Sequence, residues 1–386
     1  MKALVILLFM LLVPLGIYAQ NDTIAQQEYP KSVQGITNFA DWAMDLVTFE
    51  RENYTFFFLP LMGYEERTGF EIGVMPVWRF YIGDKPEKEG YYRPSNISPS
   101  VVVSTNGMLE FDLSSDFYTQ NAWYIQNKWV YRSMPDKFFG IGNSGDKNQV
   151  SDFEVSKFEF SGKVMKGVMD ELFVGINYDA GNYEISNIEG SVLTPEIPGY
   201  DGGGYFGVGP VVNYDQRNSI VYPTSGNYVE LSYTKYFEAV AAYEFSSIKL
   251  DVRKFIDLGN NDRVLAFQGY VHSTRGDVPF YRMAVLGGKK LFRGIAHPYK
   301  YIDNHSAYLQ VAYRSHLWWR LGYEAFAGVG NVFNEWDESV VEDLHLMTGI
   351  GLRFRVLEKE KLNFRMDLGV TNKGDRGIFF TLGEAF

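Results

Sequence analysis

The feature that most constrains this chain is a strict alternation of apolar and polar side chains that recurs from residue 53 to the end. Residues 362–369 read LNFRMDLG, in which every second side chain is apolar and the others are polar, charged or glycine. The same pattern occurs in residues 227–237, 246–254, 305–314 and 321–330. Successive side chains of an extended strand point to opposite faces, so each segment predicts a strand with one apolar and one polar face.

The length of these segments separates two all-β classes. A soluble β-sandwich also alternates, but its strands average about five or six residues. The segments here run for nine residues or more and place arginine, lysine and carboxylates together on the polar face. This pattern is typical of strands that face lipid on one side and a wet, charged interior on the other. The sequence therefore predicts an all-β fold, a transmembrane antiparallel β-barrel.

The alternation and the turn signals predict about sixteen strands. They lie near 53–64, 68–82, 97–106, 107–118, 121–133, 151–165, 169–182, 203–217, 226–237, 242–257, 261–275, 305–316, 320–332, 345–357, 360–371 and 375–386. An even number of strands places both termini on the same side, which we expect to be the periplasm. We expect the longer connections to be extracellular; these are 83–96, 134–150, 183–202 and 276–304.

Residues 1–19 have the pattern of a secretory signal peptide. Lys2 supplies the positive charge, the apolar run extends from Ala3 to Val13, and Ala19 precedes an acceptable cleavage site. The run is short for a retained membrane helix of about 20 apolar residues. The chain contains no cysteine, so no disulfide framework holds it together. We therefore predict export to the bacterial outer membrane.

A short periplasmic segment, 20–52, is predicted to precede the barrel of residues 53–386. Phe39, Trp42 and Leu46 recur at helical spacing and indicate an amphipathic helix. Such a helix would plug the barrel mouth, lie at the membrane interface or serve as a tether. The segment is shorter than an independent domain of about 50 residues.

The connection 276–304 carries the most informative motif, Leu291, Phe292, Arg293 and Gly294. Long loops tend to carry function. The glycine permits a tight backbone, and the arginine supplies a planar, permanently charged group. These residues predict a loop tip that folds back into the barrel lumen; the alternative is an exposed basic loop.

Several further segments resemble, in the same order, the bacterial surface antigen barrels of the BamA/TamA superfamily. They are PDKFFGIGN (135–143), FGVGPVVNYDQRNSIVYPTSG (206–226), LFRG (291–294), EAFAGVGN (324–331), GIGLR (349–353), RMDLG (365–369) and GIFFTLGEAF (377–386). The resemblance covers about residues 53–386. It implies that the loop tip enters the lumen and that Arg293 bonds to acidic groups of the inner wall.

The wall that would receive the tip departs from the family pattern. Alternation places Phe326, Gly328 and Gly330 on the lumen face, but Gly328 stands where the family has an aspartate. Glu324 and Asp367 are then the candidate partners of the arginine. The alternative is a solvated arginine on a loose tip. The family's assembly factors also carry periplasmic POTRA domains that receive client chains, so this chain resembles a minimal form without them.

The last strand, 375–386, is predicted to present Ile378, Phe380, Leu382 and Phe386 to lipid. The final aromatic residue resembles the targeting signal of outer-membrane barrels. In the first strand, Pro60 removes one donor from the strand ladder, which is consistent with a weak seam between 53–64 and 375–386 or with an interface turn.

No motif of enzyme chemistry accompanies this pattern. The five histidines lack metal-ligand spacing, there is no G-x-S-x-G motif, and residues 202–209 lack the lysine of a phosphate loop. We expect no enzyme activity, no cofactor and no metal; an outer-membrane phospholipase with a Ser–His pair is the rival class. The net charge of −11 also argues against binding to nucleic acid.

The function implied by the resemblance is outer-membrane biogenesis, with insertion or translocation of proteins or lipids through the seam. The expected partners are outer-membrane lipid and client outer-membrane proteins or other envelope proteins. The alternative is a passive pore or a structural subunit of an outer-membrane complex.

Overall fold

The computed structural model describes residues 34–35, 48–51, 54–65, 67–83, 93–145, 149–259, 262–337, 340–357 and 361–386. The predicted signal peptide, 1–19, and nearly all of the predicted periplasmic segment, 20–52, lie outside these residues. No helix within the described ranges has the length and apolar character needed to cross a membrane.

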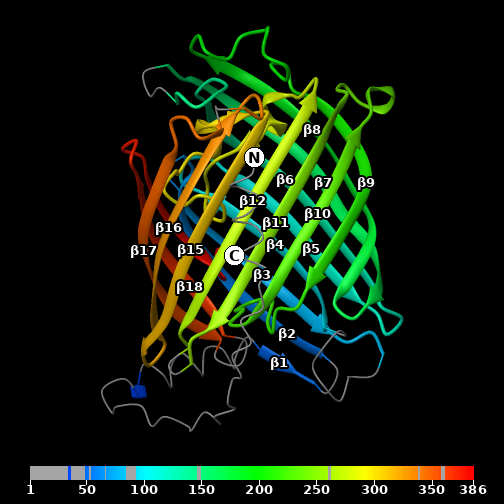
Figure 1. The fold of residues 1–386 in the computed structure, drawn as a ribbon, viewed down its shortest axis with the longest axis vertical. Coiled ribbons are helices and arrows are strands. Elements are labelled where there is room, and N and C mark those ends of the chain that lie inside the picture. Colours follow the sequence, from blue (N-terminus) through cyan, green and yellow to red (C-terminus); the bar gives the residue numbers. More distant parts are fainter. Residues whose placement is uncertain are drawn as a thin grey trace.

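Sixteen long strands form the wall of a barrel in the described chain, and three strands of two or three residues accompany them (Figure 1). The wall strands are β2 (Tyr54–Glu65), β3 (Gly69–Phe80), β4 (Ser95–Ser104), β5 (Leu109–Tyr118), β6 (Trp123–Phe138), β7 (Ser151–Met169), β8 (Leu172–Glu189), β9 (Gly203–Asp215), β10 (Gly226–Tyr236), β11 (Phe245–Asp257), β12 (Val264–Gly276), β15 (His305–Trp318), β16 (Leu321–Phe333), β17 (His345–Leu357), β18 (Leu362–Thr371) and β19 (Arg376–Leu382). The short strands are β1 (Thr48–Glu50), β13 (Ala284–Val285) and β14 (Ile302–Asp303), and the single-turn 3₁₀ helices are η1 (Glu238–Val240), η2 (Phe280–Arg282) and η3 (Pro298–Lys300).

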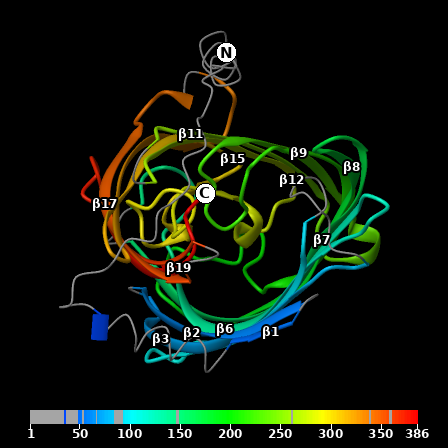
Figure 2. The same ribbon diagram turned by 90° about the horizontal axis from the view of Figure 1, so that it is seen from below.

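Each wall strand pairs antiparallel with the next wall strand in the chain, from β2 to β19. The ring is completed where β19 lies beside β2 (Figure 2). The predicted all-β barrel and its strand number are confirmed.

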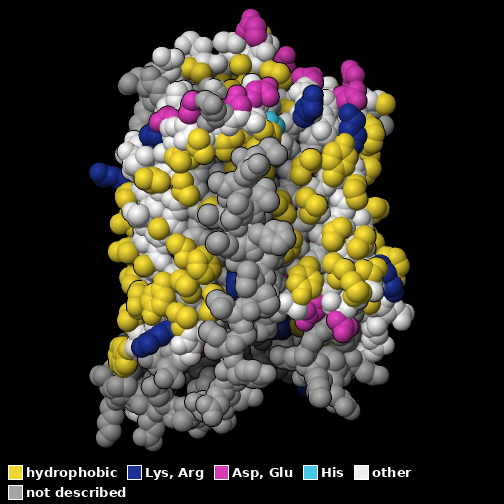
Figure 3. Space-filling view, in the orientation of Figure 1, with side chains coloured by type: hydrophobic (Ala, Val, Ile, Leu, Met, Phe, Trp, Pro, Cys, Tyr) yellow, Lys and Arg dark blue, Asp and Glu magenta, His cyan; other side chains and the backbone are white. Residues whose placement is uncertain are grey.

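The alternation read from the sequence separates the two faces of the wall. Along β18, Met366 and Leu368 are exposed on the outside, whereas Arg365 and Asp367 are fully buried inside. Hydrophobic side chains form a broad band on the outer wall, and acidic and basic side chains gather above and below it (Figure 3). Such a band is the surface that a bilayer covers.

The long connections do not all emerge at one end, as the sequence analysis expected. Because successive strands reverse direction, the connections 139–150, 190–202 and 277–304 share one end, here called the loop end. The connection 81–94 follows β3 and lies at the opposite end, where β2 begins. The expectation for 83–96 is therefore wrong, because a connection's end depends on whether an odd or an even number of wall strands precedes it.

The junction between β19 and β2 differs from the other fifteen. Every other junction has a register of directly paired residues, whereas β19 and β2, both fully described, are neighbours in the sheet order without such a register. The two strands are nevertheless close, since a Cβ added to Gly63 would lie 3.2 Å from the carbonyl oxygen of Phe380. We refer to this junction as the seam.

Candidate functional site

The connection 277–304 folds into the lumen, and we call it the lumen loop. It carries η2, the β13–β14 pair and η3, and Figure 2 shows it inside the ring of strands. Its apolar side chains Leu286, Phe292 and Ile295 are fully buried. This burial explains the direction of the loop, because apolar side chains leave water most favourably by packing inside the wall. The alternative of an exposed basic loop is wrong.

The tip of the lumen loop is a tight turn at Arg293 and Gly294. The N–H of Ile295 donates to the carbonyl oxygen of Phe292 at 3.1 Å and closes the turn. A Cβ at Gly294 would lie 2.7 Å from Cγ2 of Thr371, so only glycine lets the turn approach the wall this closely. Leu291, which precedes the turn, packs against the same buried cluster as Phe292.

Arg293 contacts both carboxylates that the sequence analysis named as candidate partners. Its Nη1 lies 2.5 Å from Oε1 of Glu324 and 3.0 Å from Oδ2 of Asp367, and all three side chains are inaccessible to solvent. The guanidinium carbon is 3.7 Å from the ring centroid of Phe326. A buried cation therefore has two anions and an aromatic face as neighbours. The alternative of a solvated Arg293 is excluded by this burial.

The contacts of Arg293 belong to a larger ionic cluster of four arginines and three carboxylates. Glu324 also contacts Arg314 and Arg353, each at 2.9 Å, and Asp367 contacts Arg353 at 2.7 Å and Arg365. Glu384, beyond the end of β19, contacts Arg353 at 3.0 Å. Sequence reasoning missed the three wall arginines and Glu384 as a group, although alternation placed Arg314 and Arg365 on the lumen face.

Glycines of the wall make room for the lumen loop. The carbonyl oxygen of Arg293 lies so close to Gly369 of β18 and Gly377 of β19 that a Cβ at either position would overlap it. A Cβ at Gly330 would lie 2.9 Å from Cδ1 of Leu286 in the lumen loop, whereas one at Gly328 would meet only atoms of neighbouring wall strands, such as Cε of Met347 at 3.1 Å. The tip therefore rests directly on the hairpin that contains the seam strand β19.

A second contact ties the lumen loop to the same hairpin. Asp375, in the turn between β18 and β19, forms an ion pair with Lys300 and accepts a hydrogen bond from the Tyr301 hydroxyl at 2.9 Å. Burial opposes ionisation of Asp375, but these contacts keep its pKa below the ordinary value. The loop thus holds the β18–β19 hairpin at its turn as well as along its strands.

The tip of the lumen loop also presents the positively charged side chain of Lys290 to the lumen. Lys290 is exposed there, and no ion pair reaches it from the described residues. Confinement within the barrel, together with the charges of Lys128 and Lys289, lowers the pKa of Lys290 to about 8.

The end of the chain departs from the expected strand. β19 ends at Leu382, and Gly383 has a positive φ of 76° that turns the backbone inward. Phe386 is consequently buried in the lumen with 4% of its surface exposed, and its carbonyl oxygen accepts a hydrogen bond from Nη2 of Arg314 at 2.7 Å. The prediction that Phe386 faces lipid is wrong, because the alternation was continued past the glycine.

The remaining predicted seam residues lie in regular strands. Ile378 is exposed on the outer wall, and Phe380 and Leu382, at the same alternate positions, are partly buried. Pro60 is exposed in the middle of β2, opposite Val74 of β3, so it does not lie in an interface turn. Its missing N–H removes one donor from the strand next to the seam.

No known family profile and no curated protein matches this sequence. Solved structures do match it. BamA from Haemophilus ducreyi lacking POTRA domains 1–3 superposes with a TM-score of 0.57 and 13% identity, covering 86% of this chain and 70% of that one. The fold is that of a BamA-type barrel.

Two CdiB structures are similar in the same way. The Escherichia coli protein gives a TM-score of 0.56 and the Acinetobacter baumannii protein 0.54, each at 9% identity and each covering 86% of this chain. This chain spans 63% and 60% of their respective lengths. At these identities the likeness establishes the fold, so the role of the barrel is argued from its own residues.

Proposed function

We propose that this barrel acts in outer-membrane biogenesis, by admitting client proteins or lipids at the seam between β2 and β19. The observation that carries the proposal is the seam itself, where β19 and β2 are neighbours in the sheet order but, unlike the other wall strands, have no register of directly paired residues among the described residues. A parted seam presents unpaired backbone groups, to which a client strand can add. The likeness to BamA and CdiB barrels supports this role.

The lumen loop would control the seam. It contacts the β18–β19 hairpin through Gly369, Gly377 and Asp375, and Arg293 is bonded to Asp367 of β18. Outward movement of β19 therefore has to break or carry along these contacts. In a passive pore, by contrast, transport would depend on the lumen and not on separation of the wall strands.

Assembly in liposomes tests the proposal. The purified chain is reconstituted, and the folding rate of a model outer-membrane barrel is compared with that in empty vesicles. We expect acceleration by the wild type and a smaller acceleration by Arg293→Ala, whose loop tip has lost its ionic partners. Equal rates with and without the protein would reject autonomous insertion.

A crosslink between β2 and β19 tests whether clients enter through the seam. Met62→Cys and Phe380→Cys occupy outward-facing positions on β2 and β19 and would be joined in detergent by a short bis-maleimide reagent. The matched control is Val174→Cys with Val212→Cys, which are directly paired on β8 and β9. We expect only the seam crosslink to abolish the acceleration. If the crosslinked protein still accelerated folding fully, entry of clients through the seam would be rejected. A passive pore would then be favoured, and conductance measurements would detect it.

A further inference from the structure

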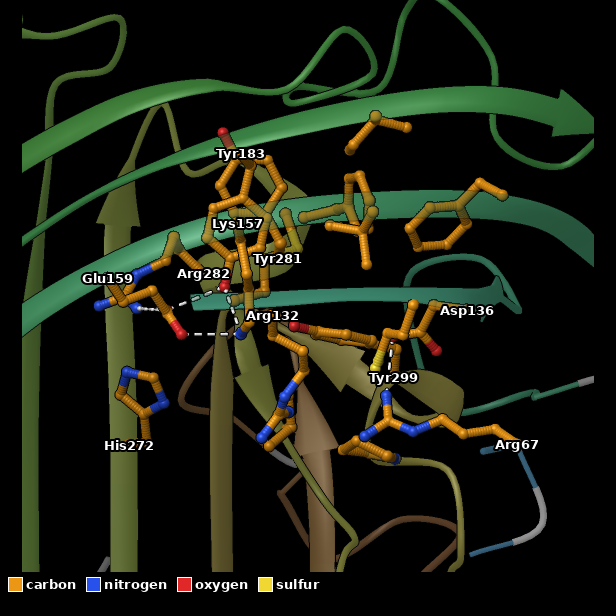
Figure 4. Close-up of a pocket in the computed structure, with 18 of the residues that line it drawn as sticks. Arg67, Arg132, Asp136, Lys157, Glu159, Tyr183, His272, Tyr281, Arg282 and Tyr299 are labelled. Carbon is orange, nitrogen blue, oxygen red and sulfur yellow. Dashed lines mark hydrogen bonds and ion pairs between the residues drawn. The ribbon is translucent and has the colours of Figure 1, made fainter. Parts of the chain in front are cut away.

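A cavity of about 290 Å³ lies inside the barrel, between the lumen loop and the wall. One side is formed by the first half of the lumen loop, including Phe280, Tyr281 and Arg282. The other side is formed by inward residues of β6, β7, β8, β11 and β12 (Figure 4). Its lining shares no residue with the Arg293 cluster, so it constitutes a separate place in the molecule.

Most charged groups of this cavity already have partners. Arg282 lies 3.4 Å from Glu159, which in turn pairs with Lys157 at 2.7 Å (Figure 4). Arg282 also contacts Asp179, which lies outside the cavity lining. Arg67 pairs with Asp136 at 2.7 Å. The two carboxylates of the lining, Glu159 and Asp136, are therefore engaged by cations other than Lys249.

Lys249 is the exception. It lies on β11, directly paired with His272 of β12, and both side chains line the cavity. No hydrogen bond or ion pair from the described residues reaches its Nζ, and His272 uses Nε2 to contact the hydroxyl of Ser247 at 3.0 Å. Lys249 is partly buried and has no ion-pair partner among the described residues, so its ammonium group is free to pair with an anion that enters the cavity. Such a group is a favourable site for an external anion.

The lining also includes apolar side chains. Phe153, Val155 and Phe280 are among them, and Phe153 and Phe280 pack edge to face at 5.8 Å. Tyr281 stacks on Tyr183 at 4.0 Å and closes one side. A cavity that combines a cation lacking an ion-pair partner among the described residues with aromatic and aliphatic side chains suits an amphiphilic ligand, and its volume lies near the lower end of the roughly 300–1,000 Å³ range of ligand pockets.

We propose that this cavity binds a small organic anion, with its carboxylate or phosphate at Lys249 and its apolar body against Phe153 and Phe280. The size restricts the body to about one ring or a short alkyl chain. The site stands on geometry that is independent of the seam, so it holds whether or not the barrel inserts clients.

The test uses the full chain in detergent and titrates benzoate by ligand-observed NMR. Benzyl alcohol supplies the same ring without the charge, and inorganic phosphate supplies charge without the ring. We expect benzoate to bind at least about tenfold more tightly than either, since a charge-assisted bond and apolar contacts act together. Absence of benzoate binding, or equal affinity for benzyl alcohol, would overturn the proposal.

Variants locate the binding. Lys249→Met should weaken benzoate binding about tenfold or more, and Lys249→Arg should retain most of it. The control Lys128→Met removes an inward lysine that pairs with Asp112 and lies outside the cavity lining, and it should leave the affinity unchanged. Lys249→Met should also raise the melting temperature of the ligand-free protein, because it removes an unpaired enclosed charge. Unchanged benzoate affinity in Lys249→Met would reject the site.

Discussion

The carbonyl oxygen of Arg293 lies against Gly377, so the tip of the lumen loop rests on the strand that borders the seam. The same arginine sends its guanidinium to Glu324 and Asp367 on β16 and β18. One residue thus joins the seam strand to two other strands of the wall, through its backbone in one direction and its side chain in the other.

Gly377→Ala should displace the loop tip. The added Cβ would overlap the Arg293 carbonyl oxygen, and overpacking of this kind costs about 1–3 kcal/mol. We expect trypsin to cleave at Lys289 or Lys290 faster than in the wild type. The control is Gly204→Ala, where the nearest atom to a new Cβ is 3.5 Å away. Equal protection of both variants would contradict the close contact.

Glu324→Gln should destabilise the barrel. This carboxylate faces Arg293, Arg314 and Arg353 in a fully buried position, and removing one partner of a buried ion pair costs about 3–5 kcal/mol. Urea unfolding followed by tryptophan fluorescence measures the change. Glu189→Gln, at an exposed position of β8, should shift the midpoint little. A midpoint for Glu324→Gln equal to that of this control would show that the cluster does not hold the fold.

The contact of Asp375 with Lys300 should make stability depend on pH. Burial opposes ionisation of Asp375, but Lys300 and Tyr301 lower its pKa below the ordinary value of 3.8. A carboxylate with a depressed folded-state pKa stabilises the fold above its unfolded-state pKa and loses that contribution as the pH falls through the folded-state value. Below about pH 4, the free energy of unfolding should therefore fall less steeply in Lys300→Met than in the wild type.

Two further variants check this assignment. Asp375→Asn removes the titrating group and should show the same shallow dependence as Lys300→Met. Lys373→Met breaks an exposed pair with Asp343 and should retain the wild-type slope, because exposed pairs contribute little. A wild-type slope in Asp375→Asn would assign the acid sensitivity to other carboxylates.

Backbone amides of β19 should exchange with solvent faster than those of β9. β9 is paired along both edges, whereas β19 has a continuous register only with β18. Hydrogen-exchange mass spectrometry on peptides covering 376–382 and 203–215 measures the difference. Slow exchange of β19 equal to that of β9 would mean that the seam is as firmly bonded as the other junctions.

The fold was largely predictable from the sequence because alternation is a local property of an extended chain. It placed Glu324, Phe326 and Asp367 on the inner face, and the structure has them there. Alternation gave the wrong face for Phe386, because the backbone turns at Gly383 and the two-residue alternation of β19 stops there. The sequence named Glu324 and Asp367 as candidate partners of Arg293 but left a solvated arginine open, because the path of a long loop does not follow from a local pattern.

The sequence by itself determined which wall side chains point inward and how many strands form the wall. The first follows from the alternation of apolar and polar residues along each strand, and the second from the turn signals between consecutive strands. Only the tertiary structure decided which inward groups meet. Arg293, Glu324 and Asp367 come from a loop and two strands separated by 31 and 74 residues from the arginine, and closure of the ring brings them together. The cavity at Lys249, and the absence of an ion-pair partner for this lysine among the described residues, also emerged only from the tertiary structure, because both depend on segments that are distant in the sequence.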